Sequence, residues 1–371
     1  MKWSKQMEAT SRIDRVCQAL RAADVSALAV VPGANLLYLL GLTMHSSERL
    51  AIAFIAQSGD VRMVLPALEQ PRAAAEAQTE IQFYPWHDAE GYAQALGQCL
   101  DDLQLPGQLG VEYTTMRVME LRAIEQFGEV ETVDATELIA GLRMTKDAAE
   151  LDAMRAAVRA VEAGLRAAID AIKPGATERE IAEVWERTMR EAGSQGPSFT
   201  TIVASGPNSA NPHYTTGDRR LQPGDLIVLD GGAQIGGYVS DITRTVALGE
   251  PSDEARKIYE TVLAANRAGV AASKPGANGA QIDGAARQVI EDAGYGQYFI
   301  HRTGHGLGME IHEPPYLHAT STAPLAAGTT FTVEPGVYVA GIGGVRIEDD
   351  VVLTENGAEC LTNFDRELII R

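Results

Sequence analysis

The chain has 371 residues and a formal net charge of −19, because 50 acidic side chains outnumber 31 basic ones. This balance argues against binding to a nucleic-acid backbone, which needs a basic face. No apolar run approaches the roughly 20 residues that span a bilayer, so we expect no membrane insertion.

The length exceeds that of one ordinary domain, which favours two domains. The first residues lack the apolar stretch of a signal peptide. The three cysteines, Cys17, Cys99 and Cys360, are far apart and in no CxxC spacing. We therefore expect reduced thiols and a cytoplasmic location.

Residues 1–143 predict a smaller N-terminal α/β domain. Apolar residues have helical spacing over 12–25, and a buried-strand pattern follows over 27–31. Two more strand patterns occupy 51–56 and 61–66.

A long helix is predicted over 145–172, because this segment is rich in Ala, Glu and Arg and stops at Lys173-Pro174-Gly175. We place the domain boundary just before this helix, so that the second domain covers 144–371.

The second domain contains an internal repeat. The sequence Lys-Pro-Gly-Ala at 173–176 recurs at 274–277, an offset of 274 − 173 = 101. Each copy leads into a predicted helix, and Thr177 and Glu180 are placed as a capping box at the start of the first. A repeat of two units indicates one duplicated domain and not a solenoid.

Each copy also contains an apolar, β-rich segment that ends on a carboxylate. The strand predicted over 224–230 ends on Asp230, and the one predicted over 328–334 ends on Glu334. The duplicated unit is therefore a helix, a strand and a hairpin.

A second carboxylate follows each of these strands. Asp241 lies 241 − 230 = 11 residues after Asp230, and Glu348 lies 348 − 334 = 14 residues after Glu334, across several glycines. Such segments can form hairpins that return the second acid beside the first. Four carboxylates buried together repel one another unless divalent cations neutralise them. The sequence therefore predicts a two-metal site, and the alternative is four unrelated surface acids.

Five of the seven histidines lie between residues 213 and 318. Glycines flank His305, which makes it the candidate for the sole nitrogen ligand. His312 lies seven residues further on, and on a strand this odd step points the two side chains to opposite faces. We expect a bend near Gly306 or Gly308 if both side chains serve one site.

The segments DGGAQIGGYVSDITRT, TGHGLGMEIHE, EPGVYV and VRIEDD together resemble the active-site motifs of the pita-bread metallopeptidases. This family includes prolidase, aminopeptidase P and methionine aminopeptidase. The resemblance covers residues 145–371, and the N-terminal part, with PGANLLYLLG, is similar to the creatinase-type domain of the first two. It implies an α+β fold with a C-terminal pita-bread catalytic domain.

The resemblance implies a dinuclear-metal enzyme that cleaves Xaa-Pro bonds. Asp230 would bind one metal, His305 and Glu334 the other, and Asp241 and Glu348 would bridge. A hydroxide between the metals would attack the scissile carbonyl, and Glu334 would also carry its proton. The oxygen-rich ligand set suits manganese, with cobalt or zinc able to substitute.

Further roles follow from the same motifs. His213 and His312 match family histidines that contact substrate and stabilise the oxyanion, and His301 lines the same pocket. Arg346 resembles the arginine that orients the bridging acids. The chain departs from some relatives at Ile235, where they carry Tyr, and Tyr214 is our candidate for a replacement phenol in substrate binding.

The motifs leave alternatives to a dipeptidase that cleaves Xaa-Pro bonds. A dipeptidase is favoured over an aminopeptidase P that acts on longer peptides. A creatinase-like amidine hydrolase shares the fold but uses no metal, and a non-catalytic pita-bread protein binds a macromolecular partner. The resemblance also implies a homodimer, with a proline-containing peptide as the substrate.

Overall fold

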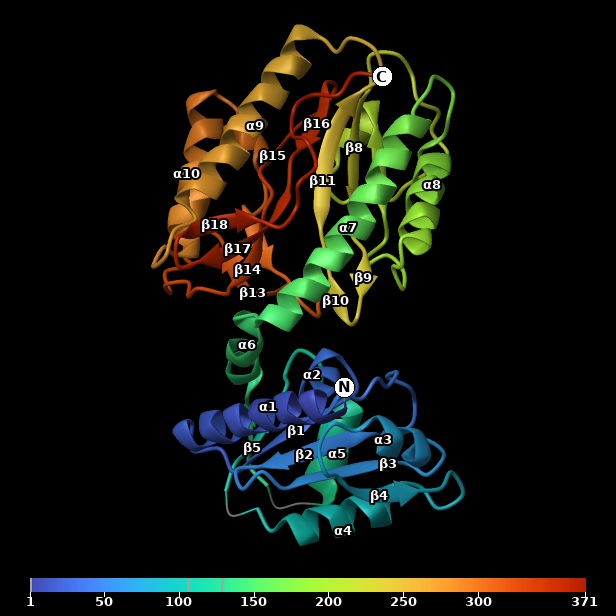
Figure 1. Cartoon of the computed structure of the whole chain (residues 1–371), viewed down its shortest axis with the longest axis vertical. Helices are drawn as coiled ribbons and strands as arrows, with labels where there is room; N and C mark the ends of the chain where they lie inside the picture. Colours follow the sequence, from blue (N-terminus) through green and yellow to red (C-terminus); the bar gives the residue numbers. More distant parts are fainter. Residues whose placement is uncertain (1, 106, 128–129) are drawn as a thin grey trace. The chain divides into compact units, whose positions relative to one another are not determined.

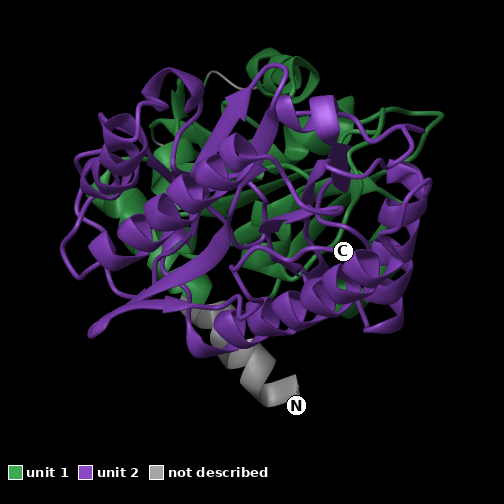
Figure 2. Cartoon of the chain, turned by 90° about the horizontal axis from the view of Figure 1, so that it is seen from above, with its two compact units in different colours: residues 1–143 green, residues 144–371 purple. Residues whose placement is uncertain are grey.

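The computed structural model describes residues 2–105, 107–127 and 130–371 (Figure 1). The chain divides into two compact units, Met1–Arg143 and Met144–Arg371, which Figure 2 distinguishes by colour.

Unit 1 is built on a six-stranded mixed sheet in the order β4-β3-β2-β1-β5-β6. The apolar patterns expected at 27–31, 51–56 and 61–66 form β1, β2 and β3, which pair antiparallel, and the remaining pairs are parallel. The strands are β1 Ala27–Val30, β2 Ile52–Ala56, β3 Val61–Pro66, β4 Gln82–Trp86, β5 Leu109–Val111 and β6 Thr132–Asp134. The helices are α1 Lys2–Ala22, α2 Ala34–Leu40, α3 Gln70–Glu76, α4 Ala93–Leu103, α5 Val118–Phe127 and α6 Thr136–Met144, so the first begins earlier than its apolar spacing indicates.

The helices of unit 2 come in two pairs that repeat. In Figure 1, one pair lies on each side of the unit, with the strands between them. The predicted capping box of Thr177 and Glu180 is present, and the corresponding Asn278 and Gln281 form another in the second copy. The pairs are α7 Ala148–Ala171 with α8 Glu178–Glu191, and α9 Asp253–Ala272 with α10 Gly279–Asp292.

The strands of unit 2 repeat in the same way. An antiparallel pair, β8 with β11, forms the centre of the first half, and its counterpart in the second half is β14 with β17. A three-stranded sheet has the order β11-β8-β7, and a five-stranded sheet has the order β13-β12-β14-β17-β18. The bounds are β7 Ile202–Ser205, β8 Leu226–Gly231, β11 Ile242–Ala247, β12 Gly304–Gly306, β13 Glu313–Leu317, β14 Thr330–Val333, β17 Asp349–Thr354 and β18 Gly357–Cys360.

Two short hairpins lie between the paired strands, as the glycine-rich segments predict. They are β9 Gln234–Ile235 with β10 Tyr238–Val239, and β15 Gly336–Val339 with β16 Gly343–Arg346. Two 3-10 turns, η1 Gly206–Ala210 and η2 Gly296–Tyr298, complete the unit. Each hairpin returns the chain to the strand from which it departed, so the residues at the two ends of each segment become neighbours.

Apolar clusters fill the space between each helix pair and its strands. In the first half, the fully buried Trp185 of α8 packs with Leu165 and Ile169 of α7 and with Leu229 of β8. In the second half, Ile258 and Val262 of α9 belong to a cluster with Val345 and Ile347. These cores hold the strand ends at fixed positions.

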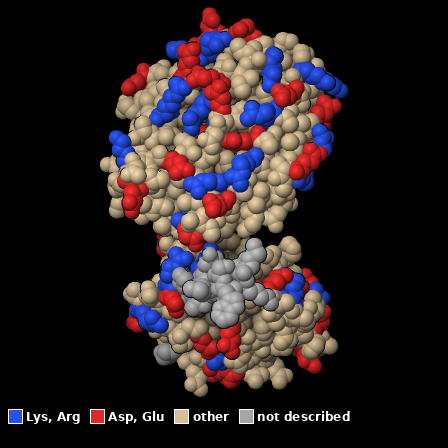
Figure 3. Space-filling model, in the orientation of Figure 1, with Lys and Arg blue, Asp and Glu red and all other residues tan. Residues whose placement is uncertain are grey.

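The face of the molecule shown in Figure 3 carries both signs of charge. Acidic and basic side chains are interspersed over the face shown in Figure 3. In the described part of the chain, no helix has the length and apolar character needed to cross a bilayer.

We predict opposite effects of glycine-to-alanine changes at two helical positions of unit 2. A Cβ at Gly164 of α7 would lie 2.7 Å from the Trp185 carbonyl oxygen and 2.8 Å from Met189 Cγ, whereas one at Gly284 of α10 meets nothing within 4 Å. Gly284→Ala should stabilise the protein by up to about 1 kcal/mol through helix propensity. Gly164→Ala should destabilise it by about 1–3 kcal/mol through overpacking. Denaturant unfolding measures both, and a stabilising Gly164→Ala would show that α7 and α8 do not pack this closely.

Candidate metal centre

A cavity of about 430 Å³ in unit 2 is lined by all the residues that the sequence proposed for the site, with the exception of Tyr214. The strand ends of both halves meet at this cavity. Its lining consists of Phe199, Ile202, Pro212, His213, Asp230, Asp241, His301, Arg302, His305, Ile311, His312, Glu334, Arg346 and Glu348.

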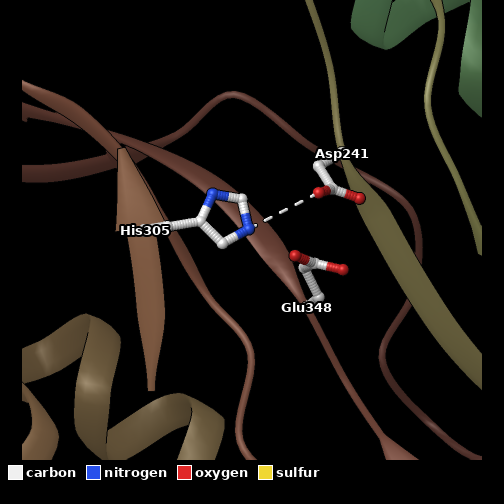
Figure 4. A group of neighbouring side chains, drawn as sticks. All are labelled: Asp241, His305 and Glu348. Carbon is white, nitrogen blue, oxygen red and sulfur yellow. Dashed lines mark ion pairs between the residues drawn. The ribbon is translucent and has the colours of Figure 1, made fainter. Parts of the chain in front are cut away.

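Three of the proposed ligands form a tight, buried group. Ligand atoms of Asp241, His305 and Glu348 all lie within 4.8 Å of one another (Figure 4). Asp241 directly precedes β11, and Glu348 directly precedes β17, the equivalent strand of the second half. His305 is the middle residue of β12. The duplication therefore delivers one carboxylate from each half, and the second half adds the imidazole.

The His305 ring has a single free nitrogen that faces the acids. Its Nδ1 lies 3.1 Å from the Gly306 carbonyl oxygen, which only accepts, so we assign the proton to Nδ1. The Nε2 lone pair then faces Glu334 Oε1 at 3.3 Å and Asp241 Oδ2 at 3.8 Å. Burial lowers the pKa of His305 to about 3, and the neighbouring His312 ring adds to this shift. A neutral imidazole oriented through Nδ1 is the form that binds metals.

The carboxyl groups of the cavity resist ionising together. Burial, and then the neighbouring acids, raise the pKa values of Asp241 and Glu348 well above their usual range. Burial raises the pKa of Glu334 to about 7, although the Arg346 guanidinium opposes the shift. Divalent cations among these groups would favour the ionised forms.

The donor atoms fit such cations. Asp230 Oδ1 and Asp241 Oδ1 are buried, and neither has a hydrogen-bond partner among the residues that the structure describes. An unsatisfied buried acceptor costs about 1–3 kcal/mol, more when it is charged. Carboxylate oxygens with one imidazole nitrogen are a donor set that hard or borderline divalent ions accept. The site is therefore chemically suited to metal ions.

Arg346 connects the two ends of the carboxylate cluster. Its Nη2 donates to Asp230 Oδ2 at 2.5 Å, and its Nε donates to Thr243 Oγ1 at 3.1 Å. Thr243 Oγ1 in turn donates to Glu348 Oε2 at 2.6 Å. The sequence led us to expect Arg346 beside the bridging acids, whereas its direct partner is Asp230 and it reaches Glu348 through Thr243.

A buried tyrosine that sequence reasoning missed joins this network. Tyr338 OH accepts from Arg346 Nη1 at 2.7 Å and lies 3.0 Å from His301 Nε2. Since His301 Nδ1 faces the Arg302 carbonyl at 2.7 Å, the phenol is the donor to His301 Nε2. The available signal was the EPGVYV segment, which places Tyr338 on β15, directly paired with the strand of Arg346.

His312 lies beside His305, as the proposed site requires. The strand register shifts between His305 and Gly306, and the centroids of the two imidazoles are 4.3 Å apart. A Cβ at Gly306 would lie 2.3 Å from the Pro314 carbonyl oxygen, so only glycine permits this close return of the chain. The bend expected near Gly306 is confirmed.

An ion pair holds the segment that follows His312. Lys146 Nζ lies 2.7 Å from Glu313 Oε1, and both side chains are almost fully buried. A Cβ at Gly308 would lie 2.7 Å from Lys146 Cε, so the His312 loop packs directly on this lysine. The start of unit 2 therefore supports the loop that carries His312.

Tyr214 is the expected site residue that does not reach the cavity. Its hydroxyl donates to Glu178 Oε2 at 3.0 Å and accepts from Asn208 Nδ2 at 2.8 Å. This placement does not fit the substrate contact expected from the sequence, although its neighbour His213 does line the cavity. Ile235 packs against the apolar cluster around Trp185.

Comparison with known proteins gives consistent matches over both units. Residues 152–355 match metallopeptidase family M24, and residues 12–145 match the creatinase/prolidase N-terminal domain. The Xaa-Pro dipeptidase of Pyrococcus furiosus is 35% identical over 359 residues, 96% of this chain and 99% of the relative.

Solved structures agree. A dipeptidase from Pyrococcus horikoshii OT3 has a TM-score of 0.92 and 41% identity, over 97% of this chain and 100% of that one. An X-Pro aminopeptidase from Thermotoga maritima has a TM-score of 0.86 and 32% identity, over 97% and 99%. The two-domain α+β fold expected from the sequence is thereby confirmed.

We predict that Mn²⁺ raises the melting temperature of chelator-treated protein, and raises it more at about pH 8 than at about pH 6.5. The pKa of Glu334 is raised from 4.5 to about 7, so the metal-free folded state loses stability as the pH rises through this interval. A cation bound to the ionised carboxylates removes that loss. The pKa of His305 is lowered from 6.5 to about 3, so its ring is already neutral in the folded protein at both pH values and no proton has to leave it for a metal to bind.

Thermal melts with and without Mn²⁺ at the two pH values measure the effect. An unchanged melting temperature on metal addition, with metal content checked by elemental analysis, would show that these acids do not share a cation site.

Proposed function

Because the chain belongs to metallopeptidase family M24, we propose that it is a dinuclear-metal peptidase that hydrolyses the Xaa-Pro bond of dipeptides. The observation that carries the proposal is the buried group of Asp241, His305 and Glu348 at a cavity that Asp230 and Glu334 also line. The relatives named Xaa-Pro dipeptidase and X-Pro aminopeptidase support the preference for proline.

In this proposal the five ligand candidates divide between two ions. Asp230 would hold one ion and His305 with Glu334 the other, and Asp241 and Glu348 would be shared between them. The ions supply Lewis acidity, which polarises the scissile carbonyl and makes water a nucleophile near neutral pH. We propose manganese, with cobalt or zinc as substitutes, because oxygen donors dominate the site.

The protein groups around the ions orient the substrate and move protons. Glu334 is the most exposed of the four acids that line the cavity. In the proposal it accepts a proton and passes it to the proline nitrogen as the peptide bond breaks. His213 and His312 donate hydrogen bonds to the substrate and to the developing oxyanion. Phe199, Ile202 and Ile311 provide the apolar wall that suits a proline ring.

Arg346 and His301 act on the orientation of these groups. Arg346 holds the Asp230 carboxylate by a direct ion pair through Oδ2, and Asp230 Oδ1, which has no hydrogen-bond partner among the described residues, would then be available to an ion. His301 is fixed by Tyr338 at the edge of the same cavity, and burial lowers its pKa to about 4, so it contacts substrate as a neutral ring.

The proposal extends to the setting in which the enzyme works. Cys17, Cys99 and Cys360 are free thiols, which supports a reducing compartment such as the cytoplasm. We also propose a homodimer, as the resemblance to prolidase implies. The complete donor set argues against a creatinase-like amidine hydrolase, which needs no metal, and against a non-catalytic binding protein.

We predict that the manganese-loaded protein hydrolyses Ala-Pro, leaves Ala-Ala intact, and cleaves Ala-Pro-Ala more slowly than Ala-Pro. Amino-acid release from the three peptides, followed by chromatography, is the measurement. Equal or faster cleavage of Ala-Pro-Ala would identify an aminopeptidase P. No release from any peptide by protein with both metals bound would contradict the proposed function.

We predict that His312→Ala lowers kcat on Ala-Pro by about 10²–10³-fold, the usual effect of losing an oxyanion donor. Metal content should stay normal, because the nitrogen ligand in the proposal is His305. His318→Ala is the matched control, since His318 bonds Thr320 and does not line the cavity. An unaltered kcat in His312→Ala with both metals bound would show that His312 only packs against His305.

A further inference from the structure

A buried carboxylate lies under the loop that carries His213. Glu178 is the first residue of α8, and its side chain is inaccessible to solvent. Its Oε1 accepts from Ser205 N at 2.8 Å, Ser205 Oγ at 2.6 Å and Asn208 Nδ2 at 3.0 Å. Its Oε2 accepts from Tyr214 OH at 3.0 Å and from Gly217 N at 3.3 Å. One side chain therefore gathers five donors from a single stretch of chain.

These donors bracket His213. Asn208 precedes it, and Tyr214 and Gly217 follow it. The loop is also held from the cavity side, where Arg346 Nη1 donates to the Pro212 carbonyl at 3.4 Å. Glu178 and Arg346 therefore fix the loop from opposite sides, and Arg346 is the same residue that holds Asp230.

The internal repeat shows that this carboxylate is not required by the duplicated fold. Both helix starts have a cap and a capping-box partner at the offset of 101, namely Thr177 with Glu180 and Asn278 with Gln281. The residue directly after the cap is Glu178 in the first copy and 178 + 101 = 279, a glycine (Gly279), in the second. Burying a carboxylate is costly, so its presence in one copy only calls for a local reason.

We propose that Glu178 and Tyr214 are positioning residues that hold His213 at the substrate cavity. The Tyr214 phenol is anchored to the Glu178 carboxylate, and the adjacent His213 then projects into the cavity while Tyr214 turns away from it. This inference rests on the proposed function, in which His213 contacts the substrate.

The chemistry of the anchor suits this role. Burial and the Glu178 carboxylate raise the pKa of Tyr214, so the phenol keeps its proton and remains a donor. The bond from Tyr214 OH to Glu178 Oε2 is 3.0 Å long, and a hydrogen bond to an ionised carboxylate is stronger than one between neutral groups. A displacement of about 1 Å in a substrate-contacting group can lower the rate by about 10²-fold, so loss of the anchor should be visible in turnover.

The test is a double-mutant cycle on Ala-Pro with Tyr214→Phe and His213→Ala, each variant checked for full metal content. Tyr214→Phe keeps the ring and removes the anchoring hydrogen bond. We expect it to lower kcat/KM by about tenfold in the otherwise unchanged enzyme, and to have no further effect in His213→Ala. Glu178→Gln, which keeps the shape and some acceptor capacity, should show a smaller loss than Glu178→Ala.

The matched control is Tyr295→Phe. Tyr295 OH donates to Glu254 Oε1 at 2.6 Å, a phenol–carboxylate bond of the second half that involves no residue of the cavity lining. Its loss should lower the melting temperature about as much as Tyr214→Phe does and leave kcat/KM unchanged.

A second measurement needs no activity. Hydrogen exchange of the peptide covering residues 206–217 should become faster in Tyr214→Phe and stay the same in Tyr295→Phe. Unchanged exchange would show that the phenol does not anchor the loop and would overturn the inference. So would an equal loss of kcat/KM from Tyr214→Phe with and without His213. If no dipeptide is hydrolysed at all, the proposed function fails, and the exchange result still decides whether Tyr214 anchors the loop.

Discussion

Mutual repulsion among buried carboxylates is the constraint around which unit 2 is organised. Asp230, Asp241, Glu334 and Glu348 line one cavity, and the directly bonded cation is the Arg346 guanidinium on Asp230. At an effective dielectric constant of about 20, two unit charges 4 Å apart still interact by about 4 kcal/mol. A fold that keeps these acids together must supply polar partners on the protein side and positive charge on the cavity side. Thr243, which donates to Glu348, is one such partner.

Duplication is a simple way to build such a cluster. Each half contributes a strand that ends near one acid and a hairpin that returns a second acid to it. When the halves meet, the two pairs of carboxylates form one site with four. The halves then differ where the chemistry differs. The second half adds His305 and His312 on an irregular segment, and the first half adds the loop with His213 above the buried Glu178. The shared scaffold positions the ligands, and the unshared loops carry the groups that meet the substrate.

The carboxylate pairs could be predicted from the sequence because their positions depend on local rules. Strands end at acids, glycines permit the returning hairpins, and the repeat tells which pairs correspond. The orientation of Tyr214 could not be predicted, because it depends on a carboxylate 36 residues away whose burial no local pattern reveals. Tyr338 was missed for a related reason. Its role comes from the register of β15 against β16, which brings it to Arg346 and His301, and a single sequence does not specify the contacts of a side chain across a hairpin.

In unit 1, too, local sequence patterns specify some elements and not others. Its first three strands could be predicted from apolar runs. Of the parallel strands, β4 and β6 are partly exposed, and β5 is buried but only three residues long, so none has a clear apolar pattern in the sequence. At the cavity, the bend between His305 and His312 could be predicted from strand geometry. Two side chains on opposite faces of a strand cannot serve one site unless the strand is interrupted. Gly306 is where the interruption occurs.

The ion pair between Lys146 and Glu313 bears on how much of the chain must accompany the catalytic motifs when they are joined to another domain. The match to the M24 family begins at residue 152, and all five ligand candidates lie beyond it. A chain cut at that point would keep every motif and lose the ammonium that neutralises a carboxylate directly beside His312. Removing one partner of a buried ion pair costs about 3–5 kcal/mol, a large part of the stability of an ordinary domain. A gene fusion that joins this catalytic unit to a different leading domain therefore keeps this ion pair only if it carries over Lys146 together with the residues that precede the motifs.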